Sequence, residues 1–130
     1  MNGSQVLEAE TVVLAIGHSA RDTFETLLAR GIPMEPKAFA VGPRVQQPPT
    51  PNNESQYGMK ECGELGPASY KLTWKASDER GVYSFCMCPG GYVVNASSEP
   101  GRLAVNGMSY HDRAGENANS AIIVTVTPED

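Results

Sequence analysis

Residues 81–113, GVYSFCMCPGGYVVNASSEPGRLAVNGMSYHDR, decide how the rest of this chain is interpreted. Two apolar runs, 82–85 and 92–94, flank the segment CMCPGG at 86–91. Because proline fixes φ and lacks an N–H, and glycine reaches positive φ, this composition predicts a tight turn between two strands. Two thiols on one turn indicate a redox site, a metal site or a backbone that something approaches closely. The alternative is a plain hairpin whose cysteines are small buried apolar side chains.

The bulk composition limits the classes of protein to consider. The chain has 130 residues, which suits one domain, and a formal net charge of −5, which argues against nucleic acid or an anionic membrane as partner. It has no apolar run of the ~20 residues that span a bilayer, and its first residues do not form a signal peptide. With three cysteines, the expected compartment is the cytoplasm, or the plastid stroma in a photosynthetic eukaryote.

The N-terminal part reads as a strand, a short exit and a helix. The near-continuous apolar run within 8–16 predicts a strand covered on both faces, and Gly17 and His18 follow it. Ser19 then predicts the start of a helix over 19–30, with Asp22 completing a capping box. This arrangement binds phosphate or ribose groups in nucleotide folds, although there is no G-x-G-x-x-G, and an ordinary βα turn is the alternative.

The remainder predicts a β-rich domain. Apolar and alternating patterns predict strands at 37–45, 68–75 and 121–126, with a shorter edge segment at 103–108 and a core position for Trp74. The polar, proline-rich residues 46–54 predict a surface loop. The fold class is therefore α+β, a β-α-β segment followed by a mostly antiparallel β domain.

The thiols leave three chemistries open. Cys88 could be redox-active, with a pKa lowered by the Pro-Gly-Gly backbone beside it. Cys86 and Cys88 could ligate a metal if Cys62 joined them with His18 or His111, although the usual zinc spacings are missing. They could instead be structural. His111, between a phenol and a carboxylate in the segment Tyr-His-Asp-Arg, is a candidate acid or base, or part of a polar surface loop.

Three long segments carry a resemblance to a known family. Residues 13–23, 81–91 and 97–120 closely resemble an uncharacterised family of FAD-dependent oxidoreductases, or dehydrogenases, from bacteria and plastid-bearing organisms. The resemblance covers residues 12–130. Family members are several times longer, and they carry an N-terminal glycine fingerprint and a second flavin-contacting segment near the C-terminus, both of which this chain lacks.

The resemblance implies an internal fragment of such an enzyme. Residues 1–36 would be part of a Rossmann-type FAD/NAD(P)-binding domain, and 37–130 a β-rich inserted domain on the substrate side. The implied cofactor is FAD, with NAD(P) as electron donor, and the implied partners are a small-molecule substrate and the missing parts of the same flavoprotein. The alternative is a non-catalytic β-rich ligand-binding or interaction domain without flavin.

The resemblance and the motifs together give a set of expected site residues, with no metal ligands among them. The expected cofactor-binding residues are Gly17, His18, Ser19, Arg21, Gly90 and Gly91, and the candidate catalytic residues are Cys86, Cys88 and His111. Without the glycine fingerprint, FAD binding by the chain alone is not expected.

Overall fold

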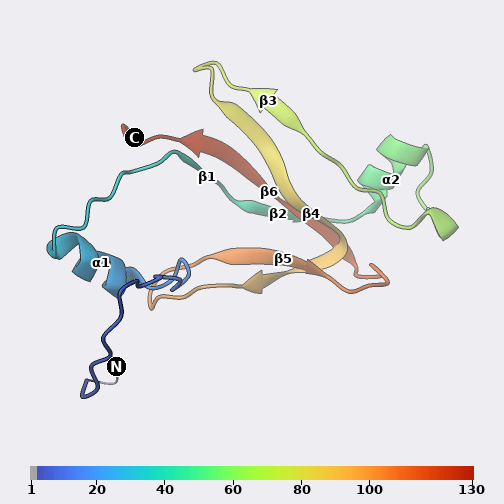
Figure 1. Ribbon diagram of the computed structural model, residues 1–130. Coiled ribbons are helices and arrows are strands. Elements are labelled where there is room, and N and C mark those ends of the chain that lie inside the picture. Colours follow the sequence, from blue (N-terminus) through green and yellow to red (C-terminus); the bar gives the residue numbers. More distant parts are fainter. Residues whose placement is uncertain (1–2) are drawn as a thin grey trace. The chain divides into compact units, whose positions relative to one another are not determined.

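A computed structural model describes residues 3–130 (Figure 1). The chain divides into two compact units, residues 1–35 and 36–130. The first contains one helix, and the second contains the sheet, a second helix and a short 3-10 turn. The molecule is thus α+β with an antiparallel sheet, as the sequence predicts.

The first unit holds helix α1 (Arg21–Ala29) and no strand among its described residues. The strand predicted at 8–16 is therefore wrong. Its side chains are open to solvent, with Val13 84% exposed. A strand is held by hydrogen bonds to a neighbouring strand, and no described segment pairs with this one. The apolar run is typical of a buried strand, and the described residues of the first unit do not bury it.

Helix α1 begins two residues later than predicted, and the predicted capping box does not form. The N-cap position is Ala20, and no side chain caps the helix there. The hydroxyl of Ser19 lies 3.4 Å from Nε2 of His18 instead. The helix buries none of its residues. Its stop at Gly31, which has φ of 79°, agrees with the predicted end.

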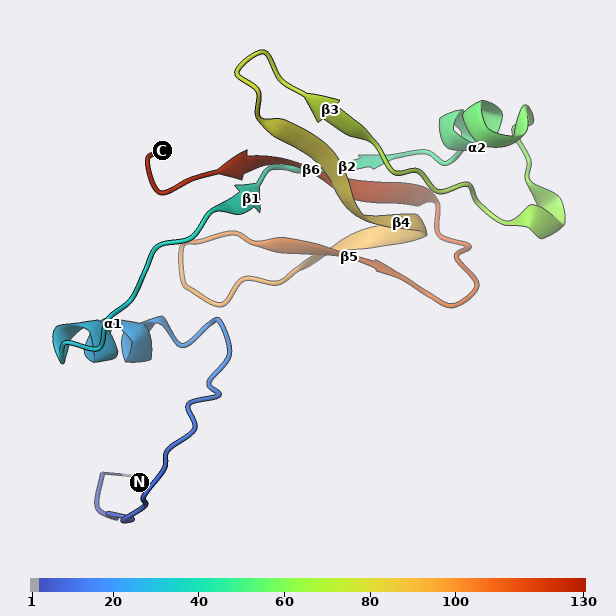
Figure 2. The ribbon, with the colours of Figure 1, turned by 45° about the horizontal axis from the view of Figure 1, so that its top comes forward.

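The second unit is a six-stranded antiparallel sheet (Figures 1 and 2). The main path runs in the order β1-β6-β4-β3, while β2 also pairs with β6 and β5 also pairs with β4. The strands are β1 (Phe39–Val41), β2 (Arg44–Gln47), β3 (Thr73–Lys75), β4 (Gly81–Asn95), β5 (Val105–Ser109) and β6 (Asn117–Val126).

Strand β6 is the centre of this sheet, because β1, β2 and β4 all pair with it. Its β-branched half, 121–126, was predicted as a strand; its polar half, 117–120, was not. The strand predicted at 37–45 is divided into β1 and β2 at Gly42. The backbone of β6 passes so close here that a Cβ at Gly42 would lie 1.9 Å from the carbonyl oxygen of Ile122.

The predicted turn at 86–91 is wrong, because these residues lie inside the single long strand β4. The pairing with β6 shifts register between Phe85 and Cys88 and again between Cys88 and Gly91. Such bulges insert an unpaired residue and bend a strand without ending it. From Gly91 onward β4 pairs with β5, and Figure 1 shows the strand curving between these two pairings. Glycines and proline here make a bend in a strand.

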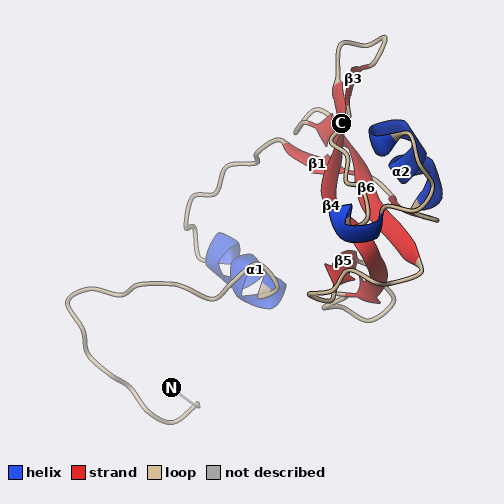
Figure 3. Cartoon of the chain, turned by 90° about the vertical axis from the view of Figure 1, so that its right-hand side faces the viewer, coloured by secondary structure: helices blue, strands red, loops and turns tan. Residues whose placement is uncertain are grey.

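Helix α2 (Thr50–Tyr57) forms where a loop was predicted at 46–54. Proline is compatible with the first helical turn, because the N–H it lacks has no partner there anyway. Asn53 then anchors the helix: its Nδ2 donates to the Lys60 carbonyl at 2.9 Å, and its Oδ1 accepts from the Ala68 N–H at 2.9 Å. The 3-10 turn (Gly63–Leu65) follows, and α2 lies beside the sheet (Figure 3).

The apolar core is thin. Among the described residues, Ala68 and Ala118 are the buried apolar residues, and the fully buried side chains of largest volume are Asn119 and Ser120. Trp74, predicted to be in the core, is 75% exposed. Several other large apolar side chains of the sheet unit are also exposed: Phe39, Val41, Leu65, Leu72, Phe85, Leu103 and Tyr110.

Candidate functional site

Strand β4 bends over residues 86–91, where its pairing with β6 shifts register. This bend borders an open depression of about 470 Å³ on the sheet unit. It brings together two of the predicted catalytic residues, Cys88 and His111, from separate parts of the chain. The segment after β5 supplies the opposite wall. The lining residues are Met87, Cys88, Pro89, Ser109, Tyr110, His111 and Arg113. Thiol, imidazole, hydroxyl and guanidinium groups therefore share one hollow.

Close backbone approach explains why the bend requires glycine. The Gly115 N–H donates to the Gly90 carbonyl at 3.0 Å, and a Cβ at Gly90 would lie 1.5 Å from the carbonyl oxygen of Arg113. A Cβ at Gly91 would lie 2.2 Å from the Met108 carbonyl oxygen. Both glycines are therefore explained by contacts within this chain, and their predicted contact with a cofactor stays a prediction.

Arg44, on β2, lies against the thiol-bearing bend. Its Nη1 donates to the Cys86 carbonyl at 3.0 Å and to Oδ1 of Asn119 at 2.6 Å. The space is shared with Cys88: a Cβ at Gly107 would lie 2.2 Å from Arg44 Nη1 and 2.8 Å from Cys88 Sγ. Arg44 was not among the predicted site residues, although an arginine within an otherwise apolar strand segment could have indicated it.

Cys86 and Cys88 are both free thiols, the first exposed and the second half-buried. Cys88 Sγ donates to the Cys86 carbonyl at 3.4 Å, and Cys86 Sγ lies 4.0 Å from Oδ1 of Asn106. Burial raises the pKa of the Cys88 thiol, and the neighbouring Cys86 raises it further, while Arg44 and Ser109 act in the opposite direction with smaller effect. The expectation of a lowered Cys88 pKa was wrong, because desolvation of the thiolate outweighs the nearby donors.

The predicted cluster around His111 is on the surface of the same hollow. His111 is exposed, and the Asp112 carboxylate accepts from the Ala114 N–H at 3.3 Å within its own turn. The rings of Tyr92 and Tyr110 pack with centroids 5.4 Å apart. A hydrogen bond to Tyr110 raises the pKa of the Tyr92 phenol, with smaller contributions from burial and charge. Of these residues, Tyr110 and His111 line the depression.

The other predicted cofactor residues, Gly17, His18, Ser19 and Arg21, belong to the first unit. All four are exposed, and Gly17 has φ of 73°. Nothing in this unit tests their proposed contact with a nucleotide, which stays a prediction. Among residues 3–130, no group of three His, Cys, Asp or Glu side chains is placed to hold a metal ion.

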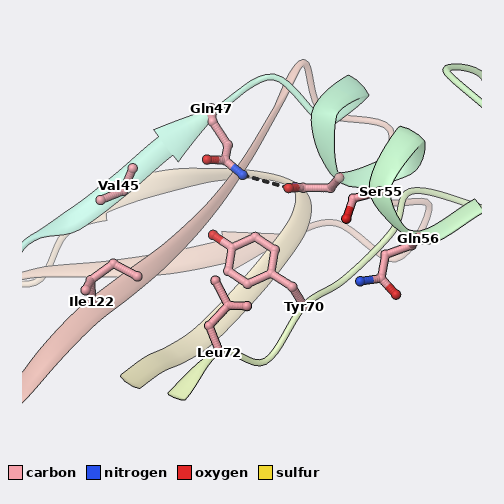
Figure 4. Close-up of a pocket in the computed structure, with 8 residues that line it drawn as sticks. Val45, Gln47, Ser55, Gln56, Tyr70, Leu72 and Ile122 are labelled. Atoms are coloured by element: carbon pink, nitrogen blue, oxygen red, sulfur yellow. Dashed lines mark hydrogen bonds between the residues drawn. The ribbon is translucent and has the colours of Figure 1, made fainter. Parts of the chain in front are cut away.

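A second hollow of about 260 Å³ lies between α2 and the sheet (Figure 4). Gln47 Nε2 donates to Asn52 Oδ1 at 2.8 Å, and the hydroxyls of Tyr70 and Ser120 are hydrogen-bonded at 2.7 Å. Asn52 Nδ2 is buried without a partner. The lining carries no charged side chain: Val45, Gln47, Asn52, Ser55, Gln56, Tyr70, Leu72 and Ile122. This hollow was not predicted, because its walls come from segments that are separate in the sequence.

The β unit coincides with a known family of domains. Residues 38–130 match the family described as FAD-dependent protein, C-terminal domain-like, and the chain belongs to this family. It is also similar to an uncharacterized protein of Clostridium beijerinckii, with 53% identity over 132 residues. That match covers all of this chain and 25% of the relative. No helix within residues 3–130 has the length and apolar character needed to cross a membrane.

Proposed function

We propose that this chain acts as the substrate-side part of a larger FAD-dependent oxidoreductase. The observation that carries the proposal is the shared depression of Cys88, Ser109, His111 and Arg113 inside the region that matches a family of FAD-dependent proteins. When bound, FAD would accept hydride or electrons from the substrate.

The size of the depression limits what these residues can hold. Pockets of about 300–1,000 Å³ enclose drug-sized ligands, and FAD is a larger, extended molecule. At about 470 Å³ the depression fits a small substrate or a single ring system. The residues present therefore fit one reacting end of the cofactor or its substrate. We expect the nucleotide end to be bound by residues 17–19 and by parts of the longer protein.

The lining residues suit distinct roles toward a bound substrate. The exposed imidazole of His111 can serve as a hydrogen-bond or proton-transfer partner of a bound substrate. The guanidinium of Arg113 can bind an anionic group, and the Ser109 hydroxyl, which donates to the Pro89 carbonyl at 3.1 Å, is held in place beside Cys88. Dehydrogenase chemistry and NAD(P) as electron donor stay predictions from the family resemblance.

The exposed sheet supports the proposal that more protein covers this unit. A hollow of about 730 Å³ is walled by apolar side chains of four strands and the loop before β5, including Val41, Phe85, Val93, Leu103 and Val105. Contiguous apolar surface of this kind marks an interaction site. The relative is about four times as long as this chain, since the match covers 25% of it. The proposed covering is the rest of the same flavoprotein.

A chimera tests the proposal: this chain replaces the matching quarter of the Clostridium protein, and bound flavin is measured by its visible absorption. His111→Ala is expected to lower the rate of flavin reduction at least tenfold with flavin content and melting temperature unchanged. The substrate that reduces the flavin is first found by screening small alcohols, amines and hydroxy acids.

His18→Ala, in the first unit, is the matched imidazole control. It is expected to lower the amount of bound flavin and to leave the reduction rate per bound flavin unchanged. An unchanged rate of flavin reduction in His111→Ala would show that His111 and the depression take no part in the reaction.

The hollow at Asn52 favours a second candidate, a non-catalytic domain that binds a neutral ligand. Its lining offers amide and hydroxyl groups beside Leu72 and Ile122, without a thiol or imidazole. The two candidates differ in one simple test. A chimera without visible flavin absorption, whose chain nevertheless binds a small amide such as benzamide, would favour the second.

A further inference from the structure

We propose that Cys86 and Cys88 form a redox pair, a dithiol that converts reversibly to an intramolecular disulfide by exchange with a small-molecule disulfide. This inference goes beyond the proposed function, because it requires no flavin and concerns a second two-electron reaction in the same bend of β4. It therefore stands or falls separately from the oxidoreductase proposal.

The two sulfur atoms lie against the same short part of β5. Cys86 Sγ lies 4.0 Å from the Asn106 side chain, and Cys88 Sγ lies 2.8 Å from where a Cβ at the next residue, Gly107, would stand. The Cys88 thiol also turns back toward residue 86, because its Sγ lies 3.4 Å from the Cys86 carbonyl oxygen. The two thiols therefore stand on adjacent parts of one irregular backbone segment.

The backbone at Cys86 is itself unusual. Its φ is 50°, in the left-handed region, where non-glycine residues are uncommon and cost energy. It lies in the first register shift, between Phe85 and Cys88. Only glycine fits this conformation without cost, yet cysteine occupies it. Cysteine at this position therefore destabilises the fold relative to glycine, and it places a thiol in the bend.

The two thiols differ in exposure, so that one is accessible to an external disulfide and the other is better placed for the internal second step. Cys86 is exposed and can attack an external disulfide, whereas Cys88 is half-buried beside Arg44. The Arg44 guanidinium offsets part of the effect of burial, which raises the pKa of the Cys88 thiol, and so assists formation of the thiolate in the second step. Cys62 is also half-buried, but it lies before the 3-10 turn, outside the bend.

The reaction balances in two exchange steps. The Cys86 thiolate attacks one sulfur of the disulfide R–S–S–R, forming a mixed disulfide and releasing R–S⁻, which takes up the proton that Cys86 lost. The Cys88 thiolate then attacks Cys86 Sγ, closing the protein disulfide and releasing the second R–S⁻, which takes up the proton of Cys88. The protein loses two electrons and two protons, and R–S–S–R is reduced to two R–SH.

The test uses the 130-residue chain with glutathione disulfide as the probe, followed by alkylation of free thiols and intact-mass measurement. The expected product has lost two hydrogens, carries no glutathione, and alkylates once, at Cys62. Cys62→Ser is expected to give the same bridge, and Cys88→Ser to stop at a glutathione adduct on Cys86. Dithiothreitol should restore all three thiols.

Arg44 variants test the second step. Arg44→Gln should slow loss of the glutathione adduct about tenfold, the effect of one pKa unit on the Cys88 thiolate, and Arg44→Lys should restore most of the rate. Circular dichroism of the sheet first verifies that each variant is folded, and the chimera replaces the chain where it is not. Three free thiols after oxidation, stable adducts on all three cysteines, or a bridge that includes Cys62 would each overturn the proposal.

Discussion

At the residue scale, Gly90 lies where two backbone segments of the site approach each other too closely for a side chain. Its φ is 51°, and a Cβ there would lie 1.5 Å from the Arg113 carbonyl oxygen. Gly90→Ala is therefore expected to destabilise the fold by about 3 kcal/mol or more, because a backbone clash adds to the cost of positive φ. The measurement is the free energy of unfolding in urea.

Gly101→Ala is the matched control for that prediction. Gly101 also has positive φ, 71°, but no atom lies within 4 Å of its Cβ position. Its substitution carries the conformational cost alone, about 1 kcal/mol. If the two variants lost equal stability, the close approach of the segment after β5 to the bend would be incorrect.

Because of the ion pair between Arg80 and Asp130, the free energy of unfolding is expected to fall in acid. Asp130 accepts two hydrogen bonds from the guanidinium, at 2.5 and 2.8 Å, and the Arg80 hydrogen bond lowers its pKa to about 2 from the ordinary 3.8. A depressed carboxyl pKa stabilises the fold above the unfolded value and loses that effect as pH falls from about 4 to 2. Asp130→Asn should flatten this part of the stability profile measured in urea between pH 2 and 6. A profile identical to that of the unsubstituted chain would contradict the pairing.

At the scale of elements, helix α2 depends on one buried amide. Asn53 is 4% exposed, and its side chain bonds both the Lys60 carbonyl and the Ala68 N–H. Asn53→Ala should cost about 1–3 kcal/mol, because it leaves buried backbone groups without partners. Ser55→Ala, on the same helix at an exposed position, should cost less than about 0.5 kcal/mol. Equal effects of the two would show that α2 is not held by Asn53.

The elements show what the sequence could and could not specify. The apolar pattern identified α1 and the β-branched half of β6, since both follow local periodicity. It failed at 8–16, because a run of apolar residues signals burial, and burial depends on neighbours that the first unit does not supply. It failed at α2, where tertiary hydrogen bonds override poor local propensity.

The site was predictable in part for the same reason. Thiols, glycines and a histidine stand out in sequence, so Cys88 and His111 were identified, although the segment bearing the thiols is a bent strand and not a turn. Arg44 and the hollow at Asn52 depend on how distant segments meet: β2 lies against β4, and residues of α2, β2 and β6 surround one hollow. Such contacts join segments that are far apart in the sequence, so a local pattern does not reveal them.

At the scale of the whole molecule, the exposed apolar surface is the dominant property. With Phe85, Leu103 and Trp74 in solvent, the 130-residue chain should bind the hydrophobic dye ANS and unfold at low urea concentration. In the chimera with the Clostridium relative, dye fluorescence per mole should fall severalfold. Equal dye binding in both proteins would show that the rest of the protein does not cover this sheet.

The same reasoning predicts how the isolated chain behaves with flavin. The residues expected to contact the nucleotide are exposed and lie in a unit that buries no helix side chain. The chain alone should stay colourless after mixing with FAD and gel filtration, whereas the chimera should retain visible flavin absorption. A yellow isolated chain would contradict the expectation that the nucleotide end of FAD is bound by other segments.

A crystal structure of the chimera with FAD would give the distance from the isoalloxazine ring to the depression. If the depression is the substrate side of the flavin site, the ring, or a substrate stacked on it, lies within about 4 Å of Cys88, Ser109 or His111. A ring bound far from these residues, with the depression open to solvent or filled by another part of the protein, would contradict that placement.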